Sequence, residues 1–242
     1  MSSHVILDNV THKELKVNTQ YKKGHGFDLS LSRVFPVEFS RLQAEYPIFF
    51  TKNQKNGAGA FEAVALFGFN DNENLYLSDR GWTANYIPLG IQRQPFLIGF
   101  EEIFEQGVPT QRPRVHIDAD HPSVSSSEGQ PAFLPQGGES PFLGHINSVL
   151  KTIHDGHSDS ADFFQALEEL ELIEPLTMKI DITETSTHNL TGLYTINEEK
   201  LPQLNAAALE SLHSKGYLQH IYMILASMPN ITSLINRKRH AL

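Results

Sequence analysis

The sequence predicts an α+β fold, with a mainly antiparallel sheet and with helices concentrated in the C-terminal half of the chain. Three observations predict this class. Strand-like apolar runs and helical patterns are mixed without the strand–helix–strand alternation of parallel sheets. No glycine-rich phosphate-binding loop follows any strand-like run. Segments with helical spacing are more numerous in the second half of the sequence.

The chain is long enough for one large domain with a substantial core. It has 242 residues, of which 40% are hydrophobic and 10% aromatic. We expect a single domain over residues 1–242. The stretch Pro122–Gly138, rich in Ser, Pro and Gly, predicts a long loop of a kind that is usually functional or mobile. The alternative is a division at this loop into two lobes, residues 1–121 and 139–242.

In the N-terminal part, apolar residues recur at helical spacing within Phe35–Tyr46 and Pro47 follows, which predicts a short amphipathic helix. Strands are predicted at the apolar runs His4–Asn9, Pro47–Thr51 and Phe61–Phe69. A tight polar turn after the last of these predicts a hairpin between Phe61–Phe69 and Leu75–Leu77.

The second half alternates between strand and helix patterns. Val115 and Ile117 alternate with polar neighbours and predict a strand over Arg112–Asp120. Polar residues 154–159 predict a loop that splits the following helical pattern in two. The remaining predicted elements are helices at Pro141–Ile153 and Ala161–Leu172, antiparallel strands at Leu176–Thr183 and Asn189–Ile196, helical structure through Leu201–Ser227 broken at Gly216, and a short turn at Ile231–Ile235.

The stretch Trp82–Phe100 is the centre of the predicted fold. It contains the only tryptophan, and two prolines bracket a helical turn over Leu89–Gln94 before an apolar strand begins at Phe96. The turn would carry Arg93 close to Trp82 and Tyr86. Because arginine stacks on aromatic rings and binds carboxylate or phosphate with its planar fork, these three residues are the candidate ligand- or partner-binding surface. The alternative is that Arg93 pairs with an internal carboxylate.

Composition excludes several classes of protein. A net charge of -9 argues against nucleic-acid binding, which depends on clustered Lys and Arg. The one basic cluster, Arg237–His240, predicts a frayed, solubilising tail. The absence of cysteine excludes disulfides and thiolate catalysis. No secretory signal and no apolar run long enough to span a bilayer are visible, so we expect a cytoplasmic protein.

His116 and Asp118 form the sharpest chemical pattern. Alternate residues of a strand share a face, and a His-x-Asp pair supplies two of the three ligands of a non-haem iron site. The third ligand would be a distal histidine, of which His145, His154 and His157 are the candidates. The alternative is that the aspartates cap a turn. No catalytic residue is predicted and no cofactor other than this iron, because nucleophile motifs are absent from the sequence.

Several segments together resemble the SapC family of bacterial proteins. They are Phe35-Pro36, Tyr46-Pro47-Ile48, Ala65–Gly68, Asn74-Leu75-Tyr76, Trp82 with Tyr86-Ile87-Pro88, Arg93 with Pro95-Phe96, and Leu193-Tyr194. The chain departs from the family at Gln94, where arginine or tyrosine is more frequent, and we expect this to be a change at the surface. The resemblance implies an accessory role, because similar members are encoded beside TonB-dependent receptors, flavin-dependent halogenase-like proteins and cupin-like proteins.

Three hypotheses follow for the function. The first is a non-catalytic cytoplasmic accessory or binding protein of SapC type, whose protein partner is halogenase-like or related to an uptake receptor, and whose recognition surface combines Trp82, Tyr86 and Arg93 with the Pro122–Gly138 loop. The second is an oxygenase-like enzyme that binds iron through His116 and Asp118. The third is a structural subunit of an assembly. The sequence leaves the oligomeric state open.

Overall fold

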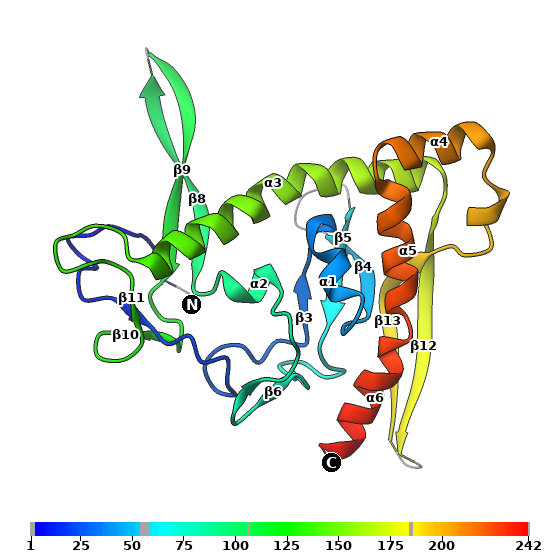
Figure 1. The fold of residues 1–242 in the computed structure, drawn as a ribbon, viewed down its shortest axis with the longest axis horizontal. Helices are drawn as coiled ribbons and strands as arrows, with labels where there is room; N and C mark the ends of the chain where they lie inside the picture. Colours follow the sequence, from blue (N-terminus) through cyan, green and yellow to red (C-terminus); the bar gives the residue numbers. More distant parts are fainter. Residues whose placement is uncertain (1–2, 54–58, 106, 184–185, 242) are drawn as a thin grey trace. The chain divides into compact units, whose positions relative to one another are not determined.

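Antiparallel sheets and helices build the protein, as the sequence predicts (Figure 1). The computed structural model describes residues 3–53, 59–105, 107–183 and 186–241. The chain forms two units, each assembled from separate stretches. Unit 1 comprises Met1–Asp28, Leu77–Trp82 and Leu89–His154, and unit 2 comprises Leu29–Tyr76, Thr83–Pro88 and Asp155–Leu242. The predicted organisation as one domain or two lobes stays a prediction.

Unit 1 is built on short antiparallel sheets. The main sheet has the order β1-β9-β8, and a smaller sheet has the order β10-β2-β11. The main sheet contains β1 (His4–Ile6), β8 (Phe96–Glu105) and β9 (Val108–Asp118); the smaller one contains β2 (Lys16–Val17), β10 (Val124–Ser125) and β11 (Gln130–Pro131); a hairpin joins β6 (Leu77–Ser78) to β7 (Gly81–Trp82); and α2 spans Leu89–Gln92. The predicted helical turn over Leu89–Gln94 and the predicted strand that begins at Phe96 are confirmed.

The Pro122–Gly138 stretch, predicted as a long loop, contains regular structure. Two short strands within it, β10 and β11, pair with β2 on opposite edges. The N–H of Ala132 also donates to the carbonyl of Leu15 at 2.9 Å, and Ala132 and Phe133 are buried. Backbone pairing with a distant segment, which local composition does not reveal, orders this stretch.

The core of unit 1 forms where the main sheet meets the first half of helix α3. Phe96 and Ile117 face each other in the sheet and are fully buried. Leu143, Ile146 and Leu150, spaced by three and four residues along α3, pack against them. Burial of this strand pair fixes the register of β8 on β9 and therefore the direction of the chain that leads into β8 from α2.

Unit 2 is organised around a five-stranded antiparallel sheet of order β12-β13-β4-β5-β3. Its strands are β3 (Leu31–Arg33), β4 (Ile48–Asn53), β5 (Ala60–Leu66), β12 (Ile173–Thr183) and β13 (Ser186–Ile196). The predicted antiparallel pairing of the last two strands is confirmed. The predicted hairpin with Leu75–Leu77 is wrong, because β5 lies between β4 and β3, and Leu77 pairs instead with Trp82. The predicted helix Phe35–Tyr46 is only two short turns, η1 (Pro36–Glu38) and α1 (Phe39–Leu42).

Helix α3 (Pro141–Glu169) is one continuous helix, so the predicted break at residues 154–159 is wrong. Within unit 2, Gly156 lies against the ring of Phe35, where an added Cβ would be 3.0 Å from the nearest ring carbon. Ser160, one turn later, is buried and donates to the carbonyl of Gly156. Gly156 and Ser160 therefore lie on the same buried face of the helix as Phe163 and Leu167.

The C-terminal helices pack on the sheet of unit 2, and Figure 1 shows α5 and α6 beside β12 and β13. They are η2 (Leu201–Gln203), α4 (Ala206–Ser214), α5 (Tyr217–Ser227) and α6 (Asn230–His240). The predicted break at Gly216 is confirmed, because this residue adopts a φ of 76° between α4 and α5. The buried Ser227 hydroxyl accepts the N–H of Ile48 at 2.9 Å and ties α5 to β4.

The basic cluster at the C-terminus is not a frayed tail. Residues 237–240 form the last turns of α6. Arg237 stacks on the ring of Tyr76 at 4.5 Å, and Lys238 forms an ion pair with Glu73. Arg239 donates to the carbonyls of two residues in β12. Partners within unit 2 therefore hold these side chains in place, although charge composition alone predicts that they are exposed to solvent.

Candidate binding site

A chain of ring contacts in unit 1 begins at Trp82. The indole lies edge-on to Tyr21, with ring centroids 6.4 Å apart. Tyr21 contacts Phe27 at 4.9 Å, and Phe27 contacts the imidazole of His121 at 5.7 Å. Phe27 is buried, whereas Trp82 and Tyr21 are half-buried. Tyr21 and Phe27, which precede β3, thus connect Trp82 to His121, which lies in the turn after β9.

His121 is held by hydrogen bonds on both ring nitrogens. Nδ1 accepts the N–H of Ser123 at 3.2 Å and lies 2.7 Å from its hydroxyl. An Nδ1 that accepts an N–H carries no proton, so the neutral ring has its proton on Nε2 and donates to Oε1 of Gln94 at 3.1 Å. Burial lowers the pKa of His121, outweighing the opposing effect of Asp118, and favours this neutral form.

Gly26 and Gln94 fix the position of this imidazole. A Cβ at Gly26 would lie 2.6 Å from the ring, and the φ of Gly26 is +85°, so both space and backbone require glycine. Gln94 is half-buried and bonded to His121. The expectation that Gln94 is a surface change is therefore wrong, because its partner lies far away in the sequence.

Arg93 precedes Gln94 and is short of internal partners. Its Nη1 donates to the carbonyl of Phe96 at 2.8 Å. Within the described part of the chain, no Asp or Glu lies at ion-pair distance from Arg93, although its side chain is half-buried. Burial lowers the pKa of Arg93, which means that folding has removed water from the cation without supplying a counter-charge. The alternative in which an internal carboxylate neutralises Arg93 thus finds no partner among these residues.

Tyr86, the third residue of the predicted surface, belongs to unit 2, whereas Trp82 and Arg93 belong to unit 1. Its hydroxyl donates to the buried carboxylate of Glu38 at 3.0 Å, and Arg41 lies over its ring. Burial and the negative charge of Glu38 raise the pKa of Tyr86. The other Glu38 oxygen accepts the N–H of Phe35 at 3.1 Å. These contacts give Tyr86 a structural role inside unit 2.

The family model of SapC matches residues 7–234. The chain belongs to the SapC family. No curated protein and no solved structure matches it. None of the helices in the described residues is sufficiently long and apolar to cross a membrane.

The two residues of the predicted iron site lie on β9 of this SapC chain. His116 and Asp118 share one face of the strand, as predicted, but the imidazole of His116 covers Gly99, which lies opposite Arg114. The ring therefore leans away from Asp118, whose carboxylate accepts the N–H of Asp120 at 3.2 Å. Among the residues that the structure describes, no three His, Asp or Glu side chains are grouped to hold a metal ion. Iron binding stays a prediction, which elemental analysis of the purified protein tests.

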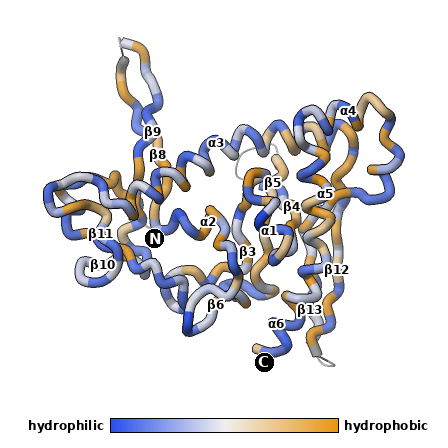
Figure 2. The backbone as a smooth tube through the Cα atoms, viewed as in Figure 1, coloured by the Kyte–Doolittle hydropathy of each residue, from blue (hydrophilic) through white to orange (hydrophobic). Residues whose placement is uncertain are grey.

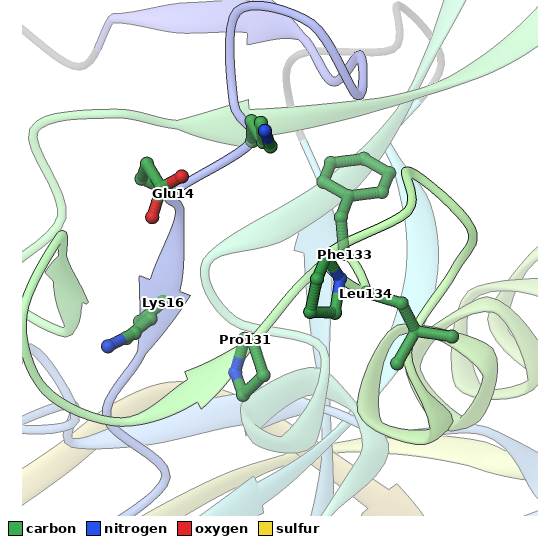
Figure 3. A pocket seen from close by; sticks show the side chains of 7 residues that line it. Glu14, Lys16, Pro131, Phe133 and Leu134 are labelled. Carbon is green, nitrogen blue, oxygen red and sulfur yellow. The ribbon is translucent and has the colours of Figure 1, made fainter.

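A pocket of about 330 Å³ lies elsewhere in unit 1, between β2 and the segment that follows β11. Figure 3 shows Glu14 and Lys16 on one side and Pro131, Phe133 and Leu134 on the other. The amine of Lys16 already donates to the carbonyl of Ser127 at 2.9 Å. The pocket shares no lining residue with the Trp82–Arg93 region, so the Pro122–Gly138 stretch contributes to a separate hollow.

Sequence reasoning missed the residues that connect Trp82 to Arg93. His121 follows the His116 and Asp118 pair by three residues, but that pair predicts a metal site and gives no sign of a hydrogen bond from His121 to Gln94. Tyr21 and Phe27 carry no signal, because they are remote from the Trp82–Phe100 stretch in sequence and reach it only through the fold.

Proposed function

We propose that this SapC chain is a non-catalytic cytoplasmic binding protein whose Arg93 accepts an anionic group, a carboxylate or phosphate, of its ligand or partner. The observation that carries the proposal is a half-buried arginine with one carbonyl acceptor and no acidic partner among the described residues. None of the nitrogens of Arg93 is both fully buried and without a partner, so its remaining donors keep some contact with solvent.

The surroundings of Arg93 suit recognition better than catalysis. His121 is neutral, bonded on both sides and fixed by Gly26, so it is occupied in positioning Gln94 and the turn that carries Arg93. An exposed anion would gain charge-assisted, bidentate hydrogen bonds from a guanidinium that is already partly dehydrated. In the same unit, the half-buried rings of Trp82 and Tyr21 contact each other, and the ring contacts that start there lead to His121, which bonds to Gln94 next to Arg93.

The family resemblance supplies the class of partner. We propose an accessory role beside an uptake receptor of the TonB-dependent kind or a halogenase-like protein, in which the anion that Arg93 binds belongs to that partner or to its substrate.

Capture of partners from the source bacterium, followed by mass spectrometry, tests this function. Wild-type protein is compared with Arg93→Gln, Arg93→Lys and, as a matched control, Arg33→Gln. Arg33 is also half-buried, but it has an internal partner, Glu62, at 3.0 Å. We expect Arg93→Gln to weaken binding of the captured partner by about 30-fold or more, as for loss of a charge-assisted pair. Arg93→Lys keeps the charge without the fork and should lie between.

The affinity of each folded variant for the captured partner decides the matter. If Arg93→Gln binds as tightly as wild type, or if Arg33→Gln loses binding to the same degree, Arg93 is not the recognition residue. A partner that is retained by Arg93→Gln but released by removal of bound iron would favour the oxygenase-like alternative.

A further inference from the structure

The hairpin of β8 and β9 extends beyond the rest of its sheet. The ten residue pairs of the hairpin continue to Glu105 and Val108, whereas β1 pairs with β9 only at residues 116–118. Figure 1 shows the outer part of this hairpin projecting as a two-stranded ribbon. The ring of His154 on α3 contacts Phe100 at 6.3 Å, but farther out the ribbon has two free edges and little cover on its faces, which is a poor arrangement for an isolated structure in water.

One face of the ribbon is a continuation of the core. Phe96 pairs with Ile117 and Ile98 pairs with Val115 within the hydrophobic core of unit 1. On the same face, the next apolar residues of β8 are Phe100 and Phe104, which face prolines of β9. Phe96 is fully buried, but Phe100 is 57% and Phe104 72% exposed, and Figure 2 shows hydrophobic positions continuing along this hairpin. The apolar face of β8 therefore continues beyond the residues that the core of unit 1 covers.

The outer edge of β9 cannot accept another strand. The carbonyl of Val115 accepts the N–H of Leu7, and the N–H of Ala119 donates to Ser3, so odd-numbered residues of β9 point their backbone groups outward. Pro109 and Pro113 are odd-numbered and have no N–H. Prolines at outward positions protect an exposed edge from pairing.

The outer edge of β8 has no such protection. The N–H of Asp118 donates to Pro95, so even-numbered residues of β9 point toward β8. In this register Phe100, Glu102 and Phe104 of β8 face odd-numbered residues and turn their backbone groups away from β9. Within the described sheet β8 is the last strand. Its open donors and acceptors are therefore next to the two exposed phenylalanines.

The charges of β8 indicate which kind of strand can pair with its free edge. The strand, FLIGFEEIFE, contains glutamates and no Lys or Arg. Glu101 is paired with Arg114 at 3.1 Å, but Glu102 is exposed and has no ion-pair partner among the described residues. If a second copy of this chain paired through its own β8, glutamates of the two strands would lie close together. If it paired through β9, Pro109 and Pro113 would lack the N–H groups that pairing needs. A basic strand from another protein has neither problem.

We infer that the free edge of β8, with the exposed face of Phe100 and Phe104, binds an extended basic segment of a different protein by strand addition. The incoming segment adds backbone hydrogen bonds at residues 100–104, covers the two phenylalanines with apolar side chains and places a Lys or Arg opposite Glu102. This surface does not involve Arg93, so it stands or falls separately from the proposed function.

Photo-crosslinking in the source bacterium tests the inference, with benzoylphenylalanine incorporated in place of Phe104. The crosslinked peptide is mapped by mass spectrometry, and a synthetic peptide of the mapped segment is then titrated against purified variants. We expect a segment rich in Lys or Arg and in apolar residues, from a protein other than this chain. A crosslink to a second copy, a crosslink to an acidic or helical segment, or no crosslink would overturn the inference.

Two substitutions at one position separate backbone pairing from charge. Glu102→Pro removes an outward N–H without touching the bonds to β9, whereas Glu102→Gln removes only the charge. We expect about a tenfold or greater loss of peptide affinity for the proline variant, and a smaller, salt-dependent loss for the glutamine variant. Tyr222→Ser, which removes an exposed aromatic residue of unit 2, is the control and should bind normally. Equal affinities of the proline and glutamine variants would exclude strand addition.

Discussion

The cationic side chains of the C-terminal basic cluster in unit 2 differ from Arg93 in unit 1 in the internal partners that they have. Arg237 stacks on Tyr76 and bonds to Thr83, and Lys238 pairs with Glu73. Arg93 has a single carbonyl acceptor and no acidic partner among the described residues, although it too is half-buried. The first group of cations therefore stabilises its unit, whereas Arg93 lacks an internal carboxylate and, in our proposal, binds an anion from outside.

The largest effect is expected where a buried pair is broken. Lys238→Ala leaves Glu73 without its cation in a place where the two side chains are only 11% and 18% exposed. We expect the free energy of unfolding in urea to fall by about 2–3 kcal/mol, less than for a fully buried pair because some solvent reaches both groups. Lys179→Ala breaks an ion pair that is mostly exposed and should cost under about 0.5 kcal/mol. Equal losses would mean that the cluster does not stabilise unit 2.

A second, smaller loss is expected at the glycine beneath His121. Gly26→Ala adds a Cβ that meets the imidazole at 2.6 Å and also strains a φ of +85°. Gly24→Ala strains a similar φ of +77° but has nothing within 4 Å, which makes it a matched control. We expect thermal or urea unfolding to give a loss of about 1 kcal/mol at Gly24 and about 2 kcal/mol at Gly26. Equal costs would show that the close approach to His121 does not matter.

The same contrast explains how far the sequence could predict the structure. The α+β class, the strand that begins at Phe96 after α2, and the antiparallel pair β12 and β13 depend on local apolar patterns, and these predictions are confirmed. The break predicted in α3 failed because Gly156 and Ser160 occupy buried positions of the helix face without being apolar. A search for apolar residues at helical spacing does not recognise glycine and serine as buried positions.

The site was less predictable than the fold. Aromatic and charge content predicts Trp82 and Arg93 as site residues, and this stays a prediction; the residues that contact them are distant in sequence. Tyr86 resembles a surface aromatic until Glu38 is seen to accept its hydroxyl. The basic C-terminal cluster likewise looks like a tail until α6 places it against Glu73 and Tyr76. Whether a charge has a partner is a property of the fold.

The titration of His121 provides a more modest test of the Arg93 region. Because burial lowers the pKa of His121 below its ordinary value of 6.5, the unfolded chain binds a proton more readily than the folded one. The stability contributed by the neutral ring is therefore complete above pH 6.5 and is lost as the pH falls through the folded pKa. The pKa of His220 is also lowered by burial, so His121 accounts for only part of the stability that the wild type loses. We expect His121→Gln to flatten the decline between about pH 7.5 and 5.5 only in part; an unchanged slope would contradict the neutral, hydrogen-bonded His121.

The smallest expected effect is the most informative about Arg93. Arg93→Gln loses one hydrogen bond to the carbonyl of Phe96, but it also removes a dehydrated cation that has no counter-charge, so the free energy of unfolding should change by no more than about 0.5 kcal/mol. Arg33→Gln should lose about 1–2 kcal/mol, because it abandons the carboxylate of Glu62, which is 15% exposed. Urea unfolding of both variants measures the difference. A large loss at Arg93 would show that it supports the fold through a partner of its own, whereas an unchanged stability together with lost binding assigns its charge to recognition.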